Sequence, residues 1–128
     1  MTDNPNINSE IDKFILEEID SVPHLEAVLL LWKHRPRRWT VAEIASSLYV
    51  DQDMAEQILK DLANRRLITM EDRDVYFCEP DEELSRLLQC VGTAYSRELI
   101  RISRLIHSKA PAALREFARA FRFTKDRD

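Results

Sequence analysis

The sequence predicts a mainly α-helical fold that contains a helix-turn-helix followed by a small β-hairpin. Apolar residues recur at spacings of three and four along most of the chain, which is typical of amphipathic helices. A single glycine among 128 residues leaves little material for hairpin-rich sheets or glycine-rich phosphate loops. Two short β-prone runs flank a charged turn. The length and the 45% hydrophobic content fit one domain with a modest core.

The first predicted helix covers residues 9–19, after a polar arm, so that residues 1–20 form an N-terminal segment. Ser9 suits the N-cap, and the apolar face comprises Ile11, Phe14, Ile15, Leu16 and Ile19. The second helix begins near Ser21 and Pro23 and contains the longest apolar run, residues 27–32. It ends before Pro36, which excludes helical geometry from the preceding residue, and Trp39 follows in a short strand.

Residues 40–64 predict two consecutive short helices. Thr40 and Glu43 have the spacing of a capping box, and Asp51 can cap the next helix. That second helix would bury a stripe comprising Met54, Ala55, Ile58, Leu59 and Leu62. Residues 67–70 and 75–78 are β-prone and flank the turn 71–74, which predicts a hairpin.

Residues 24–78 therefore resemble the winged helix-turn-helix superfamily, and in particular MarR-like transcription regulators. The resemblance rests on core positions of the first helix, the cap and the strand entry, namely Ile44, Ala45, Leu48, Val50, Asp51, Leu62, Leu67 and Ile68. It implies a winged core at residues 21–79 that binds DNA as part of a dimer. Tyr49 and Arg66 replace glycines usual in that family. A left-handed backbone there costs a non-glycine residue about 1 kcal/mol, so we expect altered turn geometry.

The C-terminal part predicts one long helix, from the acidic turn after Pro80 to the break at Pro111. Its apolar stripe outgrows a small winged core, so its far end needs a cover. The N-terminal helix of the same chain and the same helix of a second copy are the two alternatives, and we favour the second. A last amphipathic helix would run from Pro111 to about residue 123, before a tail at 124–128. Residues 80–123 would thus form a dimerisation region whose interface comprises Leu84, Leu88, Val91, Tyr95, Leu99, Ile102, Leu105, Ile106, Phe117 and Phe121.

Charge is divided unevenly along the chain. The net charge is −4, yet residues 97–128 carry nine Lys and Arg against four Asp and Glu. The basic residues form two rows at helical spacing, comprising Arg97, Arg101 and Arg104, then Arg115, Arg119 and Arg122. Such rows either bind phosphate or acidic protein, or are solvated helix flanks with favourable dipole interactions.

The DNA-binding residues that the resemblance implies lie around the second helix of the helix-turn-helix. Predicted phosphate contacts are Lys33, Arg35, Arg37, Arg38, Lys60, Arg65, Arg66 and Arg73, and predicted base-facing residues are Gln52, Glu56 and Gln57. The outward positions of this helix and the turn 71–74 are nevertheless acidic, which is unfavourable beside phosphates. The alternative hypothesis is therefore a protein-interaction module whose acidic helix binds a basic partner.

Catalysis, cofactors and metals are not expected. The three histidines are far apart in the sequence, and two isolated cysteines suit neither a zinc site nor a disulfide framework, which indicates the reducing cytoplasm. No signal peptide or membrane-spanning stretch is apparent. A ligand pocket lined by Trp32, Phe77, Tyr95 and Ile102 is a further hypothesis, although a filled core is the more usual outcome.

Overall fold

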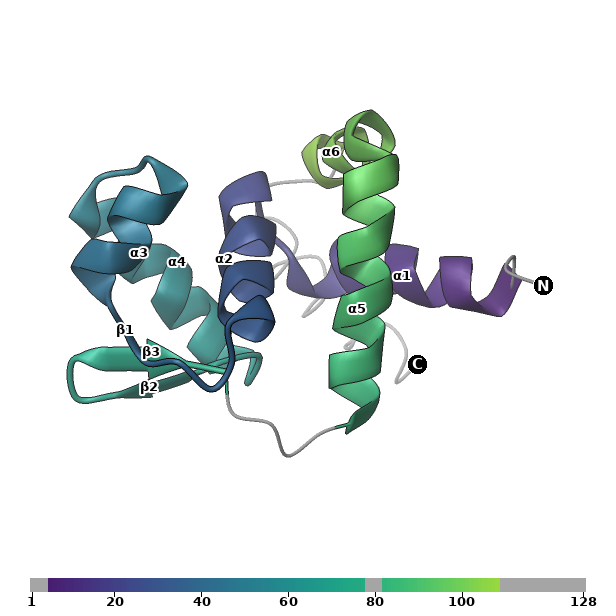
Figure 1. Ribbon diagram of the computed structural model, residues 1–128. Coiled ribbons are helices and arrows are strands. Elements are labelled where there is room, and N and C mark those ends of the chain that lie inside the picture. Colours follow the sequence, from purple (N-terminus) through teal and green to yellow (C-terminus); the bar gives the residue numbers. More distant parts are fainter. Residues whose placement is uncertain (1–4, 78–81, 109–128) are drawn as a thin grey trace, which may run out of the picture.

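The computed structural model describes residues 5–77 and 82–108. Figure 1 shows α2 at the centre, the helix-turn-helix and its small sheet on one side, and α1, α5 and α6 on the other. The bounds are α1 (Pro5–Glu18), α2 (Val22–Lys33), β1 (Trp39–Thr40), α3 (Val41–Leu48), α4 (Gln52–Asn64), β2 (Thr69–Glu71), β3 (Asp74–Tyr76), α5 (Glu82–Arg97) and α6 (Leu99–His107). The predicted mainly α winged helix-turn-helix fold is confirmed.

α1 begins earlier than predicted, at Pro5, so Ser9 lies inside the helix rather than at its N-cap. Proline is tolerated in a first turn because its missing N–H has no partner there anyway. The predicted apolar face is buried, with the exception of Leu16, which is 40% exposed. α2 matches its prediction: the Ser21 hydroxyl accepts a hydrogen bond from the His24 amide at 3.3 Å.

The helix-turn-helix has the predicted caps. The Glu43 amide donates to Thr40 Oγ1 at 3.1 Å, and the Thr40 amide donates to Glu43 Oε1 at 2.9 Å. Asp51 Oδ1 accepts from the Met54 amide at 2.7 Å. The predicted stripe of α4 is buried at four of its five positions, but Met54 is 50% exposed because it lies in the first turn beyond the core.

Tyr49 and Arg66 adopt the left-handed conformation that glycine usually supplies, with φ of 59° and 63°. The predicted change in turn geometry is therefore wrong: the backbone keeps a left-handed turn at both positions and bears its conformational cost. The sheet has the order β1-β3-β2, all antiparallel, and pairing of Glu71 with Asp74 leaves a two-residue turn. Asp72 begins this turn with φ 57°, a conformation that Asp tolerates better than most residues.

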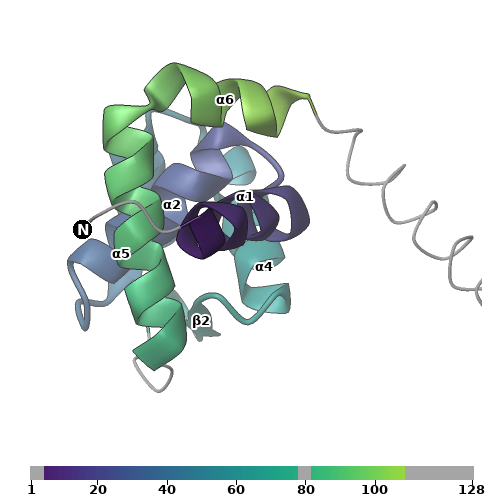
Figure 2. The ribbon, with the colours of Figure 1, turned by 90° about the vertical axis from the view of Figure 1, so that its right-hand side faces the viewer.

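The prediction of one long C-terminal helix is wrong. The helix breaks at Glu98, where φ is −128° and ψ is 50°, and α6 then continues in another direction. Figure 2 shows α6 turning away from α5 and crossing over α1. This turn carries Ile102 and Ile106 into the core, where they are 0% and 2% exposed. The far end of the apolar stripe is thus covered by α1 of the same chain.

The break changes the predicted dimer interface. Leu88, Val91, Ile102 and Ile106 lie in the core of the chain itself, so they are not available to a second copy. Phe117, Phe121 and the predicted helix after Pro111 lie outside the described residues. None of the described helices is long and apolar enough to span a bilayer.

Candidate nucleic-acid interface

The outward face of α4 is exposed and polar, as a recognition helix requires. Gln52, Asp53, Glu56, Gln57 and Lys60 are all exposed. Lys60 Nζ lies 3.7 Å from a Glu56 carboxylate oxygen, and Gln57 Nε2 donates to Asp61 Oδ1 at 2.9 Å. The only cation among these five side chains is therefore paired with its neighbour, and the face retains its acidic character.

Arginines of the segment between α2 and α3 stack on aromatic rings. The Arg37 guanidinium lies 3.7 Å from the Trp39 ring centroid, and that of Arg35 lies 4.7 Å from the Trp32 centroid. Arg35 also donates to the Trp32 carbonyl at 2.8 Å, while Arg37 lies 3.6 Å from Glu43. Stacking fixes each guanidinium and leaves its edge able to donate further hydrogen bonds.

Arg38 connects this basic segment to the wing. Its guanidinium lies 4.2 Å from the Tyr76 ring centroid and forms ion pairs with Glu71 at 3.7 Å and Asp74 at 3.9 Å. All three charged side chains are about half exposed, so these pairs contribute little to stability. Their consequence is electrostatic: two wing carboxylates partly neutralise the arginine nearest to them.

Arg65 holds α4 against the end of α1. It donates to the Glu17 carbonyl at 2.7 Å and to Asp20 Oδ1 at 3.2 Å, and lies 3.6 Å from Glu18. Its side chain is only 19% exposed. A cation at a helix C-terminus also interacts favourably with the helix dipole. The structure thus gives Arg65 a structural position, which removes it from the predicted phosphate contacts.

Three predicted contact residues have exposed cations without an ion pair among the described residues: Lys33, Arg66 and Arg73. Arg73 lies in the turn of the wing, and Arg66 lies two residues beyond the end of α4. Lys33 ends α2 and lines a hollow beside Trp32 and Arg97 of α5. It also lines a second hollow, beside Leu48 and Tyr49 at the turn of the helix-turn-helix.

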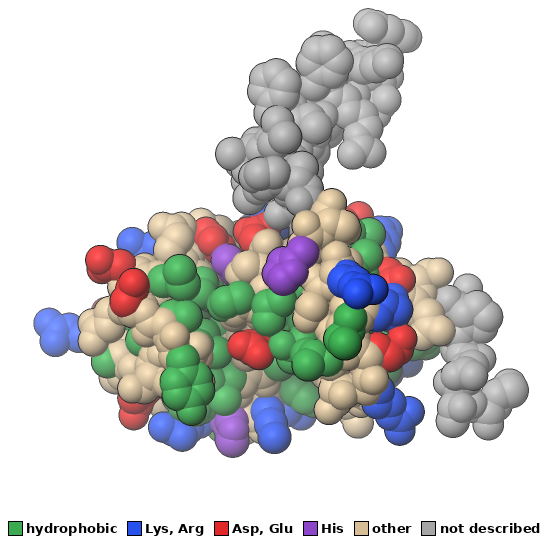
Figure 3. Space-filling model, turned by 90° about the horizontal axis from the view of Figure 1, so that it is seen from above, with side chains coloured by type: hydrophobic (Ala, Val, Ile, Leu, Met, Phe, Trp, Pro, Cys, Tyr) green, Lys and Arg blue, Asp and Glu red, His purple; other side chains and the backbone are tan. Residues whose placement is uncertain are grey.

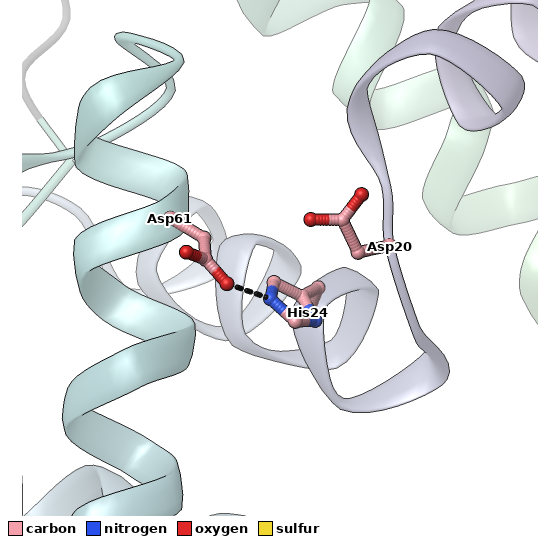
Figure 4. A group of neighbouring side chains, drawn as sticks. All are labelled: Asp20, His24 and Asp61. Carbon is pink, nitrogen blue, oxygen red and sulfur yellow. Dashed lines mark hydrogen bonds and ion pairs between the residues drawn. The ribbon is translucent and has the colours of Figure 1, made fainter. Parts of the chain in front are cut away.

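A cluster that the sequence did not predict joins α2 to α4. His24 Nε2 lies 2.8 Å from Asp61 Oδ2, and His24 Nδ1 lies 2.6 Å from Ser21 Oγ. Figure 4 shows the Asp20 carboxylate facing the same histidine, and these groups have the proximity of metal ligands. Both ring nitrogens of His24 already have hydrogen-bond partners in the chain, however, and the Asp20 carboxylate accepts a hydrogen bond from Arg65. The arrangement therefore fits an internal hydrogen-bond network better than a metal site.

The residues of the hypothetical ligand pocket do not surround one cavity. Phe77 and Ile102 are core residues, whereas Trp32 lines a hollow of about 460 Å³ and Tyr95 another of about 390 Å³. Tyr95 donates to Glu26 Oε2 at 2.9 Å. Burial, then this hydrogen bond and the Glu26 charge, raise the pKa of Tyr95 to about 12.

Exposed apolar side chains lie at both ends of the molecule. Figure 3 shows that hydrophobic side chains gather in two places on the face seen from above, with acidic side chains between them. Tyr49, in the turn of the helix-turn-helix, is 94% exposed, and Leu99 and Ile100, at the start of α6, are 50% and 66% exposed. Of the predicted interface residues, Leu99 is thus exposed, and Leu84, Tyr95 and Leu105 are half-buried.

α3, α4 and the β2–β3 hairpin define the winged helix-turn-helix class. Among solved structures, the chain resembles MepR, a transcription regulator of the Staphylococcus aureus multidrug efflux pump MepA, with 15% identity, a TM-score of 0.52, and coverage of 94% of this chain and 87% of that one. It also resembles the heme sensor protein PefR from Streptococcus agalactiae, with 14% identity and a TM-score of 0.52. That match covers 94% of this chain and 84% of PefR. At such identities these likenesses establish the fold. No family model and no curated protein matches the chain.

Proposed function

We propose that this protein is a non-enzymatic, dimeric winged-helix transcription regulator of the cytoplasm that binds duplex DNA. The observation that carries this proposal is the arrangement of α4 and the wing: a capped helix with five exposed polar side chains lies beside a hairpin whose turn presents Arg73. A helix of this kind fits the major groove, and a wing cation reaches phosphate or the minor groove. The winged unit at residues 21–79 would bind DNA and residues 80–123 would mediate dimerisation.

The proposed phosphate contacts are those exposed around this face. Arg66 and Arg73 come first because they have no ion pair among the described residues. Arg37 and Arg38 follow, since exchange of a carboxylate for a phosphate preserves their stacked positions. Arg35, which stacks on Trp32 and donates to the Trp32 carbonyl, is the next candidate. Gln52, Glu56 and Gln57 would face bases, where amides pair with adenine and carboxylates accept from cytosine.

The test is fluorescence anisotropy of labelled mixed-sequence duplex DNA, repeated at several salt concentrations. Each neutralised phosphate contributes about −0.9 to the slope of log affinity against log salt. A slope of several units is the expected result. Absence of binding at low salt would overturn the proposal, and light scattering on the same sample reports the dimer separately.

One observation favours a second candidate, a protein-interaction module. Arg37, Arg38 and Lys60 are each already paired with a carboxylate, so these cations are less available to phosphates than their number alone suggests. Reversal of Arg37 and Arg38 to Glu separates the candidates: it should abolish DNA binding, but leave capture of a basic protein by α4 intact. Reversal of Arg97 and Arg104, on the C-terminal helices, is the matched control.

A further inference from the structure

Gln57 has a better fixed partner than its neighbour Glu56, although both are predicted to face bases. Gln57 Nε2 donates a hydrogen bond to Asp61 Oδ1 at 2.9 Å, one helical turn further along α4. The Glu56 carboxylate is paired with Lys60 at 3.7 Å, and the Lys60 side chain is 59% exposed. The Asp61 side chain is more protected, with 28% of its surface exposed. The contact of Gln57 is therefore the more ordered of the two.

The partner of Gln57 is itself held from α2. The second oxygen of Asp61, Oδ2, lies 2.8 Å from His24 Nε2, and Figure 4 shows this contact crossing from α4 to α2. Because this ring nitrogen faces a carboxylate, it carries a hydrogen, so His24 donates and Asp61 accepts. His24 is 8% exposed, and its Nδ1 lies 2.6 Å from Ser21 Oγ. Both oxygens of the Asp61 carboxylate are thus engaged, one by α2 and one by the exposed face of α4.

The Asp61 carboxylate determines the orientation of the Gln57 amide. A glutamine side chain has an oxygen that accepts hydrogen bonds and an NH2 group that donates two. Only the NH2 group can face Asp61, because the carboxylate repels an amide oxygen. One N–H of Gln57 is used in this bond. The second N–H and the amide oxygen remain available to a ligand, on a residue that is exposed.

One donor together with one acceptor is the pattern that adenine complements in the major groove. Adenine presents N7 as an acceptor and its N6 amino group as a donor, whereas guanine presents two acceptors, N7 and O6. An amide that turns freely can direct its NH2 group toward guanine. With its nitrogen held by Asp61, Gln57 would bring its oxygen against guanine O6, which is unfavourable. The held amide therefore favours adenine over guanine.

We propose that His24 and Asp61 are positioning residues that fix the Gln57 amide for an adenine in the major groove. This inference rests on the DNA binding proposed above and names one base of the bound site. His24 and Asp61 act through Gln57 and not by contact with the base. A side chain that is already held in its bound conformation loses less freedom on binding. The contact between α2 and α4 thereby contributes to sequence preference as well as to stability.

Selection of bound duplexes from a randomised DNA library, followed by sequencing, tests this proposal. The unmodified protein should enrich adenine at one position, and Gln57→Ala should lose that preference alone. Asp61→Ala should reduce the preference for adenine over guanine there by about tenfold, and His24→Leu by about threefold, on the scale expected for fixing one side chain. His24→Gln provides a donor for Asp61 and should retain the preference.

A modified base and a control variant separate positioning from folding. 7-Deaza-adenine lacks the N7 acceptor, so at the selected position it should weaken binding of the unmodified protein by about tenfold and leave binding of Gln57→Ala unchanged. Tyr95→Phe removes a hydrogen bond between α5 and α2 and is the control. It should leave every base preference unchanged. Each variant is compared at a temperature at which it is fully folded.

NMR of the free protein tests the same link without DNA. The side-chain amide protons of Gln57 should shift between the unmodified protein and His24→Leu, because Asp61 loses the donor that holds it. Those of Gln52, in the first turn of α4, should not shift. Unchanged Gln57 signals would show that His24 does not hold the amide, and would overturn the proposal.

The DNA selection has its own contradicting outcomes. An unchanged adenine preference in Asp61→Ala or in His24→Leu would show that Gln57 needs no positioning. An equal loss of preference at every position would give His24 and Asp61 a purely structural role. Either result overturns the inference and leaves the proposed DNA binding standing. Absence of DNA binding by the unmodified protein would instead contradict the proposed function, and this inference with it.

Discussion

The Tyr95 hydroxyl donates a hydrogen bond to Glu26 Oε2 at 2.9 Å and so connects α5 to α2. The two residues are 69 positions apart, and the bond crosses from the winged unit to the C-terminal helices. Because Tyr95 is partly buried and faces a carboxylate, its neutral form is favoured and its pKa rises to about 12.

A spectrophotometric titration should detect this pair. In the variant Tyr49→Phe, Tyr76→Phe, which keeps Tyr95 as its only tyrosine, we expect ionisation near pH 12 rather than near 10. Glu26→Gln should lower the pKa only in part, since burial is the largest cause. A folded-state pKa above the unfolded value stabilises the protein below pH 10, and that stability is lost as the pH rises to 12. Titration near pH 10 in the folded single-tyrosine variant would refute the contact.

Glycine should be favourable at position 49 and unfavourable two residues earlier. Tyr49 is left-handed and 94% exposed, so Tyr49→Gly relieves conformational cost and removes little packing. We expect the free energy of unfolding to rise by up to about 1 kcal/mol. The rise is limited because glycine also increases the conformational entropy of the unfolded chain. Ser47→Gly, inside α3, should lower the free energy of unfolding by about 0.5 kcal/mol. Urea denaturation measures both, and changes of the same sign would contradict this explanation.

Asp61 should stabilise the domain through His24. Asp61→Ala leaves His24 Nε2 without its partner at a site where the histidine is 8% exposed. Loss of a partner for a buried polar group costs about 1–3 kcal/mol. Gln57→Ala, which removes only an exposed hydrogen bond to the same carboxylate, should change stability by less than about 0.5 kcal/mol. Thermal and urea unfolding of the two variants provide the comparison.

Arg73 and Arg65 should affect different properties. Arg73→Ala should reduce the magnitude of the salt slope of DNA binding by about 0.9 for one phosphate contact, without changing the melting temperature. Arg65→Ala should lower the free energy of unfolding by about 1–3 kcal/mol, since it leaves Asp20 and the Glu17 carbonyl without this donor. It should leave the salt slope unchanged. A smaller salt slope with unchanged stability for Arg65→Ala would instead indicate that Arg65 contacts a DNA phosphate.

Local signals in the sequence were sufficient for the winged unit. Thr40 with Glu43, and Asp51 before α4, define the helix starts by hydrogen bonds that span only three residues. The absence of glycine at Tyr49 and Arg66 predicted altered turn geometry, and this prediction was wrong, because both residues adopt the left-handed conformation at its conformational cost. Acidic character of the α4 face was also evident, since the side facing outward follows from helical periodicity.

Contacts between distant elements were not predictable in the same way. No proline or glycine lies beside the break at Glu98, and the apolar stripe continues across the break with unchanged spacing. The sequence therefore contains no local signal for it. Only packing against α1 selects the bent arrangement, because it buries Ile102 and Ile106 within the chain. Arg65 was predicted as a DNA contact because its hydrogen bond to the Glu17 carbonyl, at the end of α1, joins residues that are far apart in the sequence.

The sequence by itself determined the helices around the turn, the hairpin and the signs of the exposed faces, because these depend on spacing and on hydrogen bonds between near neighbours. Tertiary structure alone decided the partner of each charge, the break between α5 and α6, and the hydrogen bond between His24 and Asp61. Those features depend on which elements meet in space, and residues up to 89 positions apart, such as Asp12 and Arg101, meet only after the chain has folded.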